Sequence, residues 1–152
     1  MTELKTLLFA TDFSTGAARC CNMARTLARL SEARLHIVHI VTEGDGWPLQ
    51  ATEQRAVPES QQATSSEGEM KRFIGRYFPN LDQEPFTVTW DIIAARHTSS
   101  EIVHQAELID AGMILMGTEG RSGVKRLLAG STAEAVVRTA SVPVVTIRNG
   151  DR

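Results

Sequence analysis

The hydrophobic and polar positions of the chain follow two alternating patterns. Short runs dominated by apolar residues predict five β-strands, over residues 4–10, 34–41, 85–93, 113–116 and 142–147. Between these runs, apolar side chains recur every three to four residues and predict four helices. Their apolar positions are Ala17, Cys21, Ala24 and Ala28 in the first helix, Met70, Phe73, Ile74 and Tyr77 in the second, Ile102, Val103, Ala106 and Ile109 in the third, and Ala133, Val136, Val137 and Ala140 in the fourth.

Strands and helices that alternate along a chain predict an α/β protein with a doubly wound, five-stranded parallel sheet. The run 113–116 is wholly apolar, as expected for a strand that is covered on both faces. Pro143, near the start of the last strand, suits a position at the edge of the sheet. The polar stretch 42–68 shows no period and predicts a long loop. Without an internal repeat, residues 1–152 are expected to form a single domain.

Local signals also predict where several helices begin. Ser14 is the expected N-cap of the first helix. Thr98 with Glu101, and Ser131 with Glu134, have the spacing of capping boxes. The third and fourth helices are therefore expected to start directly after Thr98 and Ser131.

Composition and charge exclude several classes of protein. The chain has 152 residues, of which 42% are hydrophobic, and a formal net charge of −2, which argues against bulk nucleic-acid binding and against a polybasic membrane patch. No apolar run approaches the roughly 20 residues of a membrane span. The N-terminal segment MTELKTLLFATDF carries Asp12 and has too short an apolar core for a signal peptide, so a cytoplasmic protein is predicted.

The two cysteines are neighbours in the sequence, at Cys20 and Cys21. Adjacent residues on a helix point in different directions, which makes a disulfide between them geometrically poor. No second pair exists to complete a zinc site. Both side chains are expected to be small buried residues.

A glycine-rich segment, MGTEGRSGVKRLLAGSTAE over residues 116–134, follows the fourth strand. Its spacing matches neither the GxGxxG motif nor a Walker A loop. Gly117 and Gly120 would let the backbone approach a ligand without a Cβ clash, and Gly130 would open a helix whose free N–H groups favour anions. Arg121 adds positive charge. Phosphate groups of a nucleotide fit this combination, while a plain tight turn with Ser131 as N-cap is the alternative.

A second polar stretch, Ala10-Thr11-Asp12, follows the first strand. Parallel α/β sheets bind ligands at the carboxyl ends of their strands, where the strand order reverses. If the first and fourth strands are neighbours there, this stretch and the glycine-rich segment face one crevice. Asp12 would then either contact a ribose or a metal ion, or merely cap the first helix.

The spacing Gly117-x2-Gly120-x9-Gly130-Ser131 resembles the ATP-binding motif of the universal stress protein family. The segments FATDFS (9–14), IVHIV (37–41) and 114–145 are similar to that family's core blocks, in the same order. The resemblance implies strand order 3-2-1-4-5 in an adenine nucleotide alpha hydrolase-like fold, and a homodimer formed through the last strand. It also implies the ATP-binding subgroup and a role in stress response or regulation, with an unknown regulatory protein as target.

The same resemblance implies which residues hold the nucleotide. The ligand would be ATP, or AMP or ADP, with Mg²⁺ as a possible companion of the phosphates. Adenosine would lie against the first, second and fourth strands, and the phosphates against the glycine-rich segment. The implied set is Ala10, Thr11, Asp12, Ile40, Met116, Gly117, Gly120, Arg121, Gly130, Ser131 and Thr132. Arg96 or His97 stands where many members have a glycine, and this residue would either lie near the phosphates, where Arg96 would add a charge, or face solvent.

The sequence favours a binding protein over an enzyme. It contains no Ser-His-Asp or Cys-His arrangement, and its four histidines show no metal-ligand spacing. Phosphoryl transfer needs more arranged positive charge and metal than the motif supplies. A slow ATPase or autophosphorylating switch, and an interaction module without nucleotide, remain the alternatives.

Overall fold

The structure, a computed structural model, describes residues 3–14, 17–42, 65–118 and 131–148. Strands and helices alternate along these segments, as the hydrophobic pattern predicts. In chain order the elements are β1 (Thr6–Ala10), α1 (Ala17–Ser31), β2 (Arg34–Val41), α3 (Ser66–Tyr77), the 3-10 helix η1 (Leu81–Gln83), β3 (Val88–Ala94), α4 (Thr98–Leu108), β4 (Met113–Gly117), α5 (Ser131–Thr139) and β5 (Val144–Ile147).

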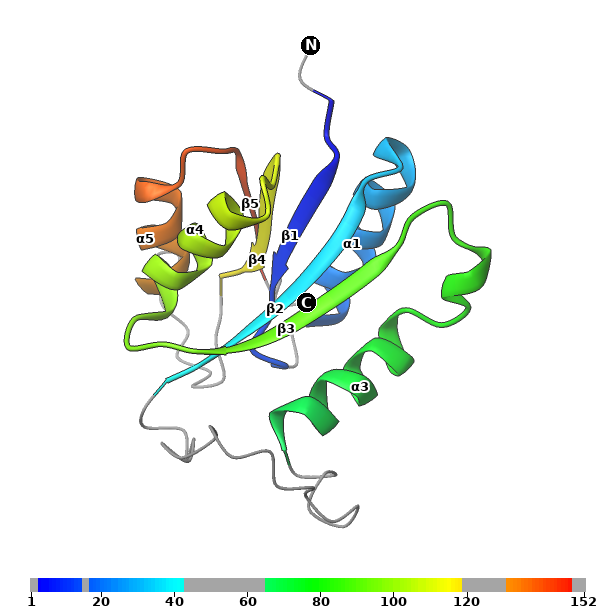
Figure 1. Cartoon of the computed structure of the whole chain (residues 1–152), viewed down its shortest axis with the longest axis horizontal. Helices are drawn as coiled ribbons and strands as arrows, with labels where there is room; N and C mark the ends of the chain where they lie inside the picture. Colours follow the sequence, from blue (N-terminus) through cyan, green and yellow to red (C-terminus); the bar gives the residue numbers. More distant parts are fainter. Residues whose placement is uncertain (1–2, 15–16, 43–64, 119–130, 149–152) are drawn as a thin grey trace.

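The five strands form one parallel sheet in the order β3-β2-β1-β4-β5. The predicted doubly wound α/β fold is confirmed, and so is the expected neighbourhood of β1 and β4. Helices α1 and α3 cover one face of the sheet, and α4 and α5 cover the other (Figure 1). Because β1 lies at the centre of this three-layer arrangement, all five of its residues are buried.

Alternate residues of β1 contribute to two separate hydrophobic cores. Leu7 and Phe9 pack against α1 and α3, whereas Leu8 and Ala10 pack against α4 and α5. This alternation follows from the period of two in a β-strand. A strand buried on both faces favours apolar residues at consecutive positions, which accounts for the run LLFA that follows Thr6. Val137, one of the apolar positions that predicted α5, is 54% exposed.

Several predicted boundaries are wrong by a few residues. The loop expected over 42–68 ends earlier, because α3 begins at Ser66 and the Ser65 hydroxyl accepts a hydrogen bond from Gly68 N at 3.1 Å. Thr98 is not a cap: it is the first residue of α4, and His97 occupies the N-cap position without a side-chain bond. Glu101 accepts a hydrogen bond from Gln105 instead. The caps expected at Ser14 and Ser131 adjoin segments outside the described residues.

Three strands begin later than their predicted runs, and β1 begins at Thr6 rather than residue 4. β3 begins at Val88 rather than residue 85, and β5 begins at Val144 rather than residue 142. Proline lacks the N–H that a strand ladder needs, and both predicted runs contain a proline, at Pro85 and Pro143. Pro143 still contributes its carbonyl, which accepts a hydrogen bond from Ile114 N at 3.0 Å.

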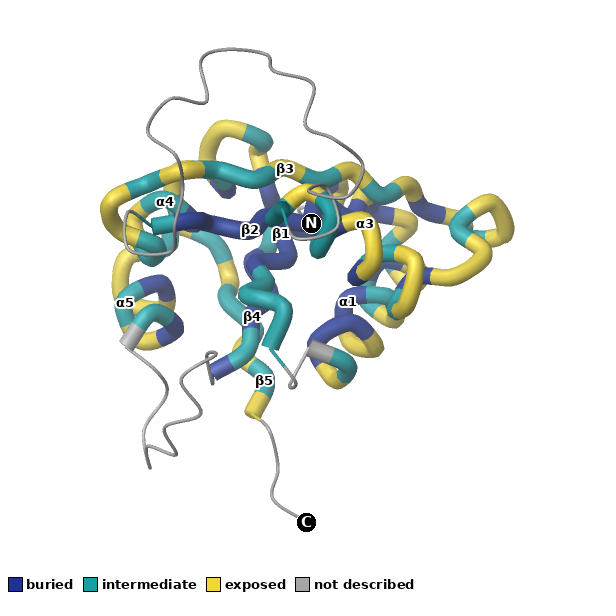
Figure 2. Tube along the Cα trace, turned by 90° about the horizontal axis from the view of Figure 1, so that it is seen from below, coloured by how far each residue is buried: buried dark blue, intermediate teal, exposed yellow. Residues whose placement is uncertain are grey.

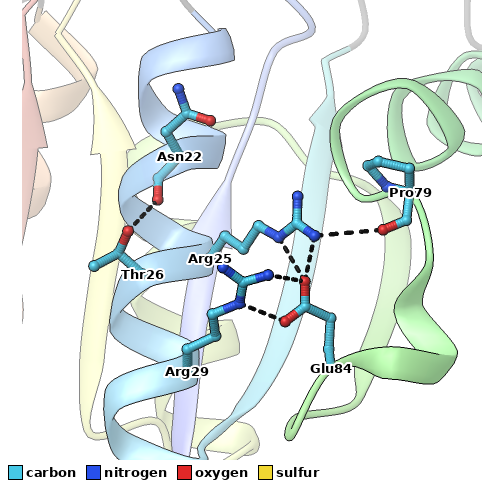
Figure 3. A network of polar contacts seen from close by, with 6 residues as sticks. All are labelled: Asn22, Arg25, Thr26, Arg29, Pro79 and Glu84. Atoms are coloured by element: carbon cyan, nitrogen blue, oxygen red, sulfur yellow. Dashed lines mark hydrogen bonds and ion pairs between the residues drawn. The ribbon is translucent and has the colours of Figure 1, made fainter.

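A carboxylate ties α1 to the segment between η1 and β3. The Glu84 side chain is only 2% exposed and accepts hydrogen bonds from Arg25 and Arg29, four residues apart on α1 (Figure 3). The bond from Arg29 Nε to Glu84 Oε2 is 2.5 Å long. The Arg29 guanidinium, followed by that of Arg25, lowers the pKa of Glu84. Charge-assisted hydrogen bonds from two arginines of α1 therefore hold the segment that leads into β3.

The cysteines are free and buried in the core between the sheet and α1, as predicted. Burial, and then the negative charge of Asp12, raises the pKa of Cys20 to about 11. Burial also raises the pKa of Cys21. Both thiols therefore remain protonated at neutral pH and are poor nucleophiles.

Among the described segments, none of the helices combines the length and the apolar character that crossing a bilayer requires.

Candidate functional site

The ends of β1 and β4 lie side by side at one edge of the sheet. Ala10 pairs with Met116 on one side and with Val38 of β2 on the other. The chain continues from β1 to β2 and β3 in one direction, and from β4 to β5 in the other, so the strand order reverses between β1 and β4. Figure 2 views the molecule from this end of the strands. This reversal is where parallel α/β sheets open a crevice for ligands.

The loop that follows β1 is tied to β2. Thr11 N donates a hydrogen bond to the carbonyl of Val38 at 3.0 Å. The Thr11 carbonyl lies 2.8 Å from Nδ1 of His39, whose side chain is buried. Phe13 N in turn donates to the Thr11 hydroxyl at 3.1 Å. The predicted site residue Thr11 is thus anchored through both of its backbone polar groups.

Phe13 adopts a left-handed backbone conformation, with φ 61°. This conformation costs a residue with a Cβ about 1–2 kcal/mol, so contacts nearby must compensate. The Phe13 ring lies between His39 and Phe73 of α3, with ring centroids 4.3 Å and 5.5 Å away. Phe73 also contacts Phe9 and Tyr77. An aromatic cluster therefore holds the loop after β1 against the α1 and α3 face.

Asp12 stands between Thr11 and Phe13 and is half-buried. Its Oδ1 accepts a hydrogen bond from Ser14 N at 2.9 Å. This bond closes a short turn before α1, which begins only at Ala17, so it does not cap that helix. It orients the carboxylate at the edge of the crevice and occupies one of its two oxygens in this bond.

Ile40 and the end of β4 complete the described part of the crevice. Ile40 is 8% exposed and lies on the same sheet face as Ala10 and Val38. Met116 is buried, and Gly117 pairs with Ile147 of β5. The next residue, Thr118, is buried and donates from N to the Ile147 carbonyl at 3.0 Å.

The remaining predicted residues belong to the glycine-rich segment and to α5. Gly120, Arg121 and Gly130 lie outside the described residues. Ser131 is the first described residue of α5, and Thr132 is half-buried in its first turn. Because β4 and β5 are parallel, α5 runs back along the sheet, and its N-terminus lies at the edge where β4 ends.

The structure brings six predicted residues together and adds two that the sequence reasoning missed. The six are Ala10, Thr11, Asp12, Ile40, Met116 and Gly117. The two additions are His39 and Phe13. His39 is the polar residue of the segment IVHIV (37–41), a signal that a buried group needs a hydrogen-bond partner. Phe13 carries no sequence signal, because its backbone conformation is one that glycine normally adopts.

The loop after β3 carries Arg96 and His97, one of which was expected to stand in place of a glycine. Arg96 and His97 are both exposed, and His97 caps α4 only through its backbone. Within the described ranges, no group of three or more His, Cys, Asp or Glu side chains is arranged to hold a metal ion.

Comparison with known proteins gives a family match over residues 3–148, to the universal stress protein family. Universal stress protein Slr1230 from Synechocystis is 28% identical over 93% of this chain and 42% of its own length. Universal stress protein MJ0577 from Methanocaldococcus jannaschii is 26% identical over 95% of this chain and 94% of its own length. MJ0531 from the same organism matches over 50 residues, 29% of its length. The matched segments therefore cover less than half the length of Slr1230 and of MJ0531.

Solved structures share the fold at low sequence identity. MJ0577 superposes with a TM-score of 0.75 at 23% identity, covering 99% of this chain and 100% of that one. A universal stress protein in complex with cAMP gives 0.68 at 17% identity, covering 97% and 98%. One from Archaeoglobus fulgidus in complex with dAMP gives 0.62 at 21% identity, covering 96% and 99%. The family match extends over nearly the whole chain, and the protein belongs to the universal stress protein family.

Proposed function

We propose that this protein binds an adenine nucleotide, ATP or alternatively AMP or ADP, in the crevice between the ends of β1 and β4. The observation that carries the proposal is the pairing of Ala10 with Met116, which sets the Thr11–Asp12 turn beside the start of the glycine-rich segment. The N-terminus of α5 at the same edge supplies free N–H groups of the kind that attract phosphate.

The solved relatives support the adenine nucleotide as ligand class. One solved structure is a complex with cAMP and another is a complex with dAMP. These two molecules share an adenine base, a pentose and a single phosphorus. A crevice with an apolar wall from Ile40 and Met116 and a polar turn at Asp12 offers both kinds of surface that such a ligand presents.

Each residue has a defined role in this proposal. Asp12, with Ala10 and Thr11 beside it, contacts the ribose end, and the backbone of Ile40 contacts adenine. Met116 and Gly117 pack along the nucleoside. The phosphates are held by Gly120, Arg121, Gly130, Ser131 and Thr132, with Mg²⁺ as a companion of a triphosphate.

We further propose that nucleotide binding serves a regulatory or stress-response role, in the cytoplasm, in a homodimer formed through β5. The described outer edge of β5 has no neighbouring strand. Pairing with a second copy would give the backbone N–H and C=O groups of this edge hydrogen-bond partners. In this proposal the protein binds the nucleotide without hydrolysing it. A slow ATPase is the second candidate, and phosphate release above the buffer rate would favour it.

The test has two parts. Purified protein is denatured and its released small molecules are assayed for adenine nucleotide, and nucleotide-free protein is titrated calorimetrically with adenosine, AMP, ADP, ATP and GTP. Binding of the adenine compounds with weaker binding of GTP is expected. If neither released adenine nucleotide nor binding of any adenine compound is found, the protein is an interaction module and the proposal is wrong.

A further inference from the structure

We propose that His39 is the positioning residue of the nucleoside site: it holds the loop after β1 in the shape that presents Asp12 to the ribose. The inference rests on the proposed nucleotide binding, and concerns a residue on the opposite sheet face from Ile40. His39 lies beneath the loop and is only 8% exposed.

The first contact is a hydrogen bond to the loop backbone. His39 Nδ1 lies 2.8 Å from the Thr11 carbonyl oxygen. A carbonyl can only accept, so Nδ1 must carry the proton in this contact. Thr11 N also donates to Val38, the residue that precedes His39. Two successive residues of β2 therefore hold both backbone polar groups of Thr11.

The second contact is between rings. The His39 and Phe13 ring centroids are 4.3 Å apart, with an interplanar angle of 33°. Phe13 is the residue with left-handed φ, and its ring contact with His39 helps to retain that conformation. Asp12 is thus flanked on both sides, at Thr11 and at Phe13, by residues that His39 contacts. His39 therefore contacts the residues on both sides of Asp12, while the hydrogen bond from Ser14 N orients the carboxylate itself.

His36 provides a matched comparison on the same strand. It is also buried, at 6% exposed, but it lies on the other face of the sheet. Its Nδ1 lies 2.7 Å from the Thr89 hydroxyl and its Nε2 lies 3.3 Å from Asp91 Oδ2, both on β3. The same replacement at His36 therefore perturbs β2 without removing a contact to the loop after β1.

The binding experiment uses three variants of the full chain. His39→Phe keeps a ring beside Phe13 and removes the donor, and we expect about a tenfold loss of affinity for both adenosine and ATP, the scale of one buried hydrogen bond. His39→Asn restores a donor near the Nδ1 position and should recover part of that loss. His36→Phe should bind both ligands as the unmodified protein does.

The outcomes separate the inference from the proposed function. If the unmodified protein binds no adenine compound, the proposed function fails. If it binds them and a folded His39→Phe binds equally well, or His36→Phe loses as much, the positioning role alone is overturned.

A measurement on the unmodified protein covers the case in which His39→Phe does not fold. Nitrogen NMR of the histidine rings should show His39 protonated at Nδ1, with a resonance that shifts when adenosine is added. A bare Nδ1 at His39, or a resonance that ignores adenosine while the ligand binds, overturns the inference without any variant.

Discussion

Ala10 and Met116 lie directly opposite each other on neighbouring parallel strands, and the chain leaves the sheet one or two residues after each of them. The Thr11–Asp12 turn and the start of the glycine-rich segment are therefore neighbours, although more than a hundred residues separate them in sequence. The strand order reverses at this pair. A ligand in the crevice would contact both stretches. Because the two stretches are distant in sequence, a mutation can change one of them without changing the other.

Replacing Gly130 with Val should weaken ATP binding by a factor of ten or more, which corresponds to about 1.4 kcal/mol. A β-branched side chain before α5 would crowd the approach of phosphate to the helix N-terminus. Adenosine affinity should change much less, because its proposed contacts are on β1, β2 and β4. Calorimetric titration of both ligands measures the difference.

Gly75→Ala is the matched control for that glycine replacement. Gly75 lies in α3, and a Cβ there would meet no atom within 4 Å. The change should leave ATP affinity unaltered and raise the free energy of unfolding by about 0.5–1 kcal/mol, since alanine loses less conformational entropy in a helix. A folded Gly130→Val protein that binds ATP normally would show that the glycines only build a turn.

Replacing Thr146 with Pro should weaken the proposed dimer. The Pro143 and Ile147 carbonyls point toward β4, where they accept from Ile114 N and Thr118 N. Because alternate residues of a strand direct their backbone groups to opposite sides, the N–H of Thr146 points to the free edge of β5. Proline removes that donor and leaves the bonds to β4 in place. Analytical ultracentrifugation should show a shift toward monomer.

Thr146→Val is the control, because it keeps the N–H and a similar shape on an exposed residue. It should sediment like the unmodified protein. If the proline variant remains dimeric while folded, the dimer uses another surface.

Replacing Glu84 with Gln should lower the free energy of unfolding at neutral pH, because Arg25 and Arg29 lose their shared carboxylate. The pKa of Glu84 is lowered from 4.5, chiefly by its hydrogen bond with Arg29. A lowered carboxyl pKa stabilises the fold above the unfolded-state pKa, and this stabilisation is lost as pH falls through the folded-state pKa. The two proteins should therefore differ in denaturant titrations at neutral pH and converge in acid.

Glu134→Gln is the comparison for Glu84. Glu134 also pairs with an arginine, Arg138, at 2.6 Å, but both side chains are more than half exposed. Exposed pairs contribute little to stability. If both replacements lower the free energy of unfolding equally, the low exposure of Glu84 does not strengthen its ion pairs.

Protonation of His36 should destabilise the protein on mild acidification. Burial lowers the pKa of His36 from 6.5, against the opposing effect of Asp91, and Arg34 lowers it further. Below pH 6.5 the unfolded chain then binds more protons than the folded one, so the free energy of unfolding falls until the folded-state pKa is passed. Denaturant titrations should show a shallower decline in His36→Gln. If the two proteins show the same slope, the pH dependence comes from groups other than His36 and the prediction is wrong.

The periodicity of the chain was enough to predict the elements and the fold class. Residues 34–41 were predicted as a strand and coincide with β2, and the wholly apolar run 113–116 became the buried strand β4. These features are predictable because burial on one or two faces imposes a period of 2, of 3.6, or an unbroken apolar run on the residues themselves. The strands that surround the site were therefore predictable from the pattern of apolar positions alone.

The position of the candidate site needed one further assumption, that β1 and β4 are neighbours. Nothing in the local pattern specifies which strands pair. The resemblance to the universal stress protein family supplied that order, and the sheet confirms it.

Only the tertiary structure decided the contacts that hold the site and the entry into β3. His39 reaches a carbonyl 28 residues away, and Glu84 is held by arginines 55 and 59 residues away. Phe13, Glu32, Asn80 and Asp110 adopt left-handed φ without being glycine. A local pattern cannot encode such features, because they depend on strand register and on which side chains packing brings within about 3 Å of one another.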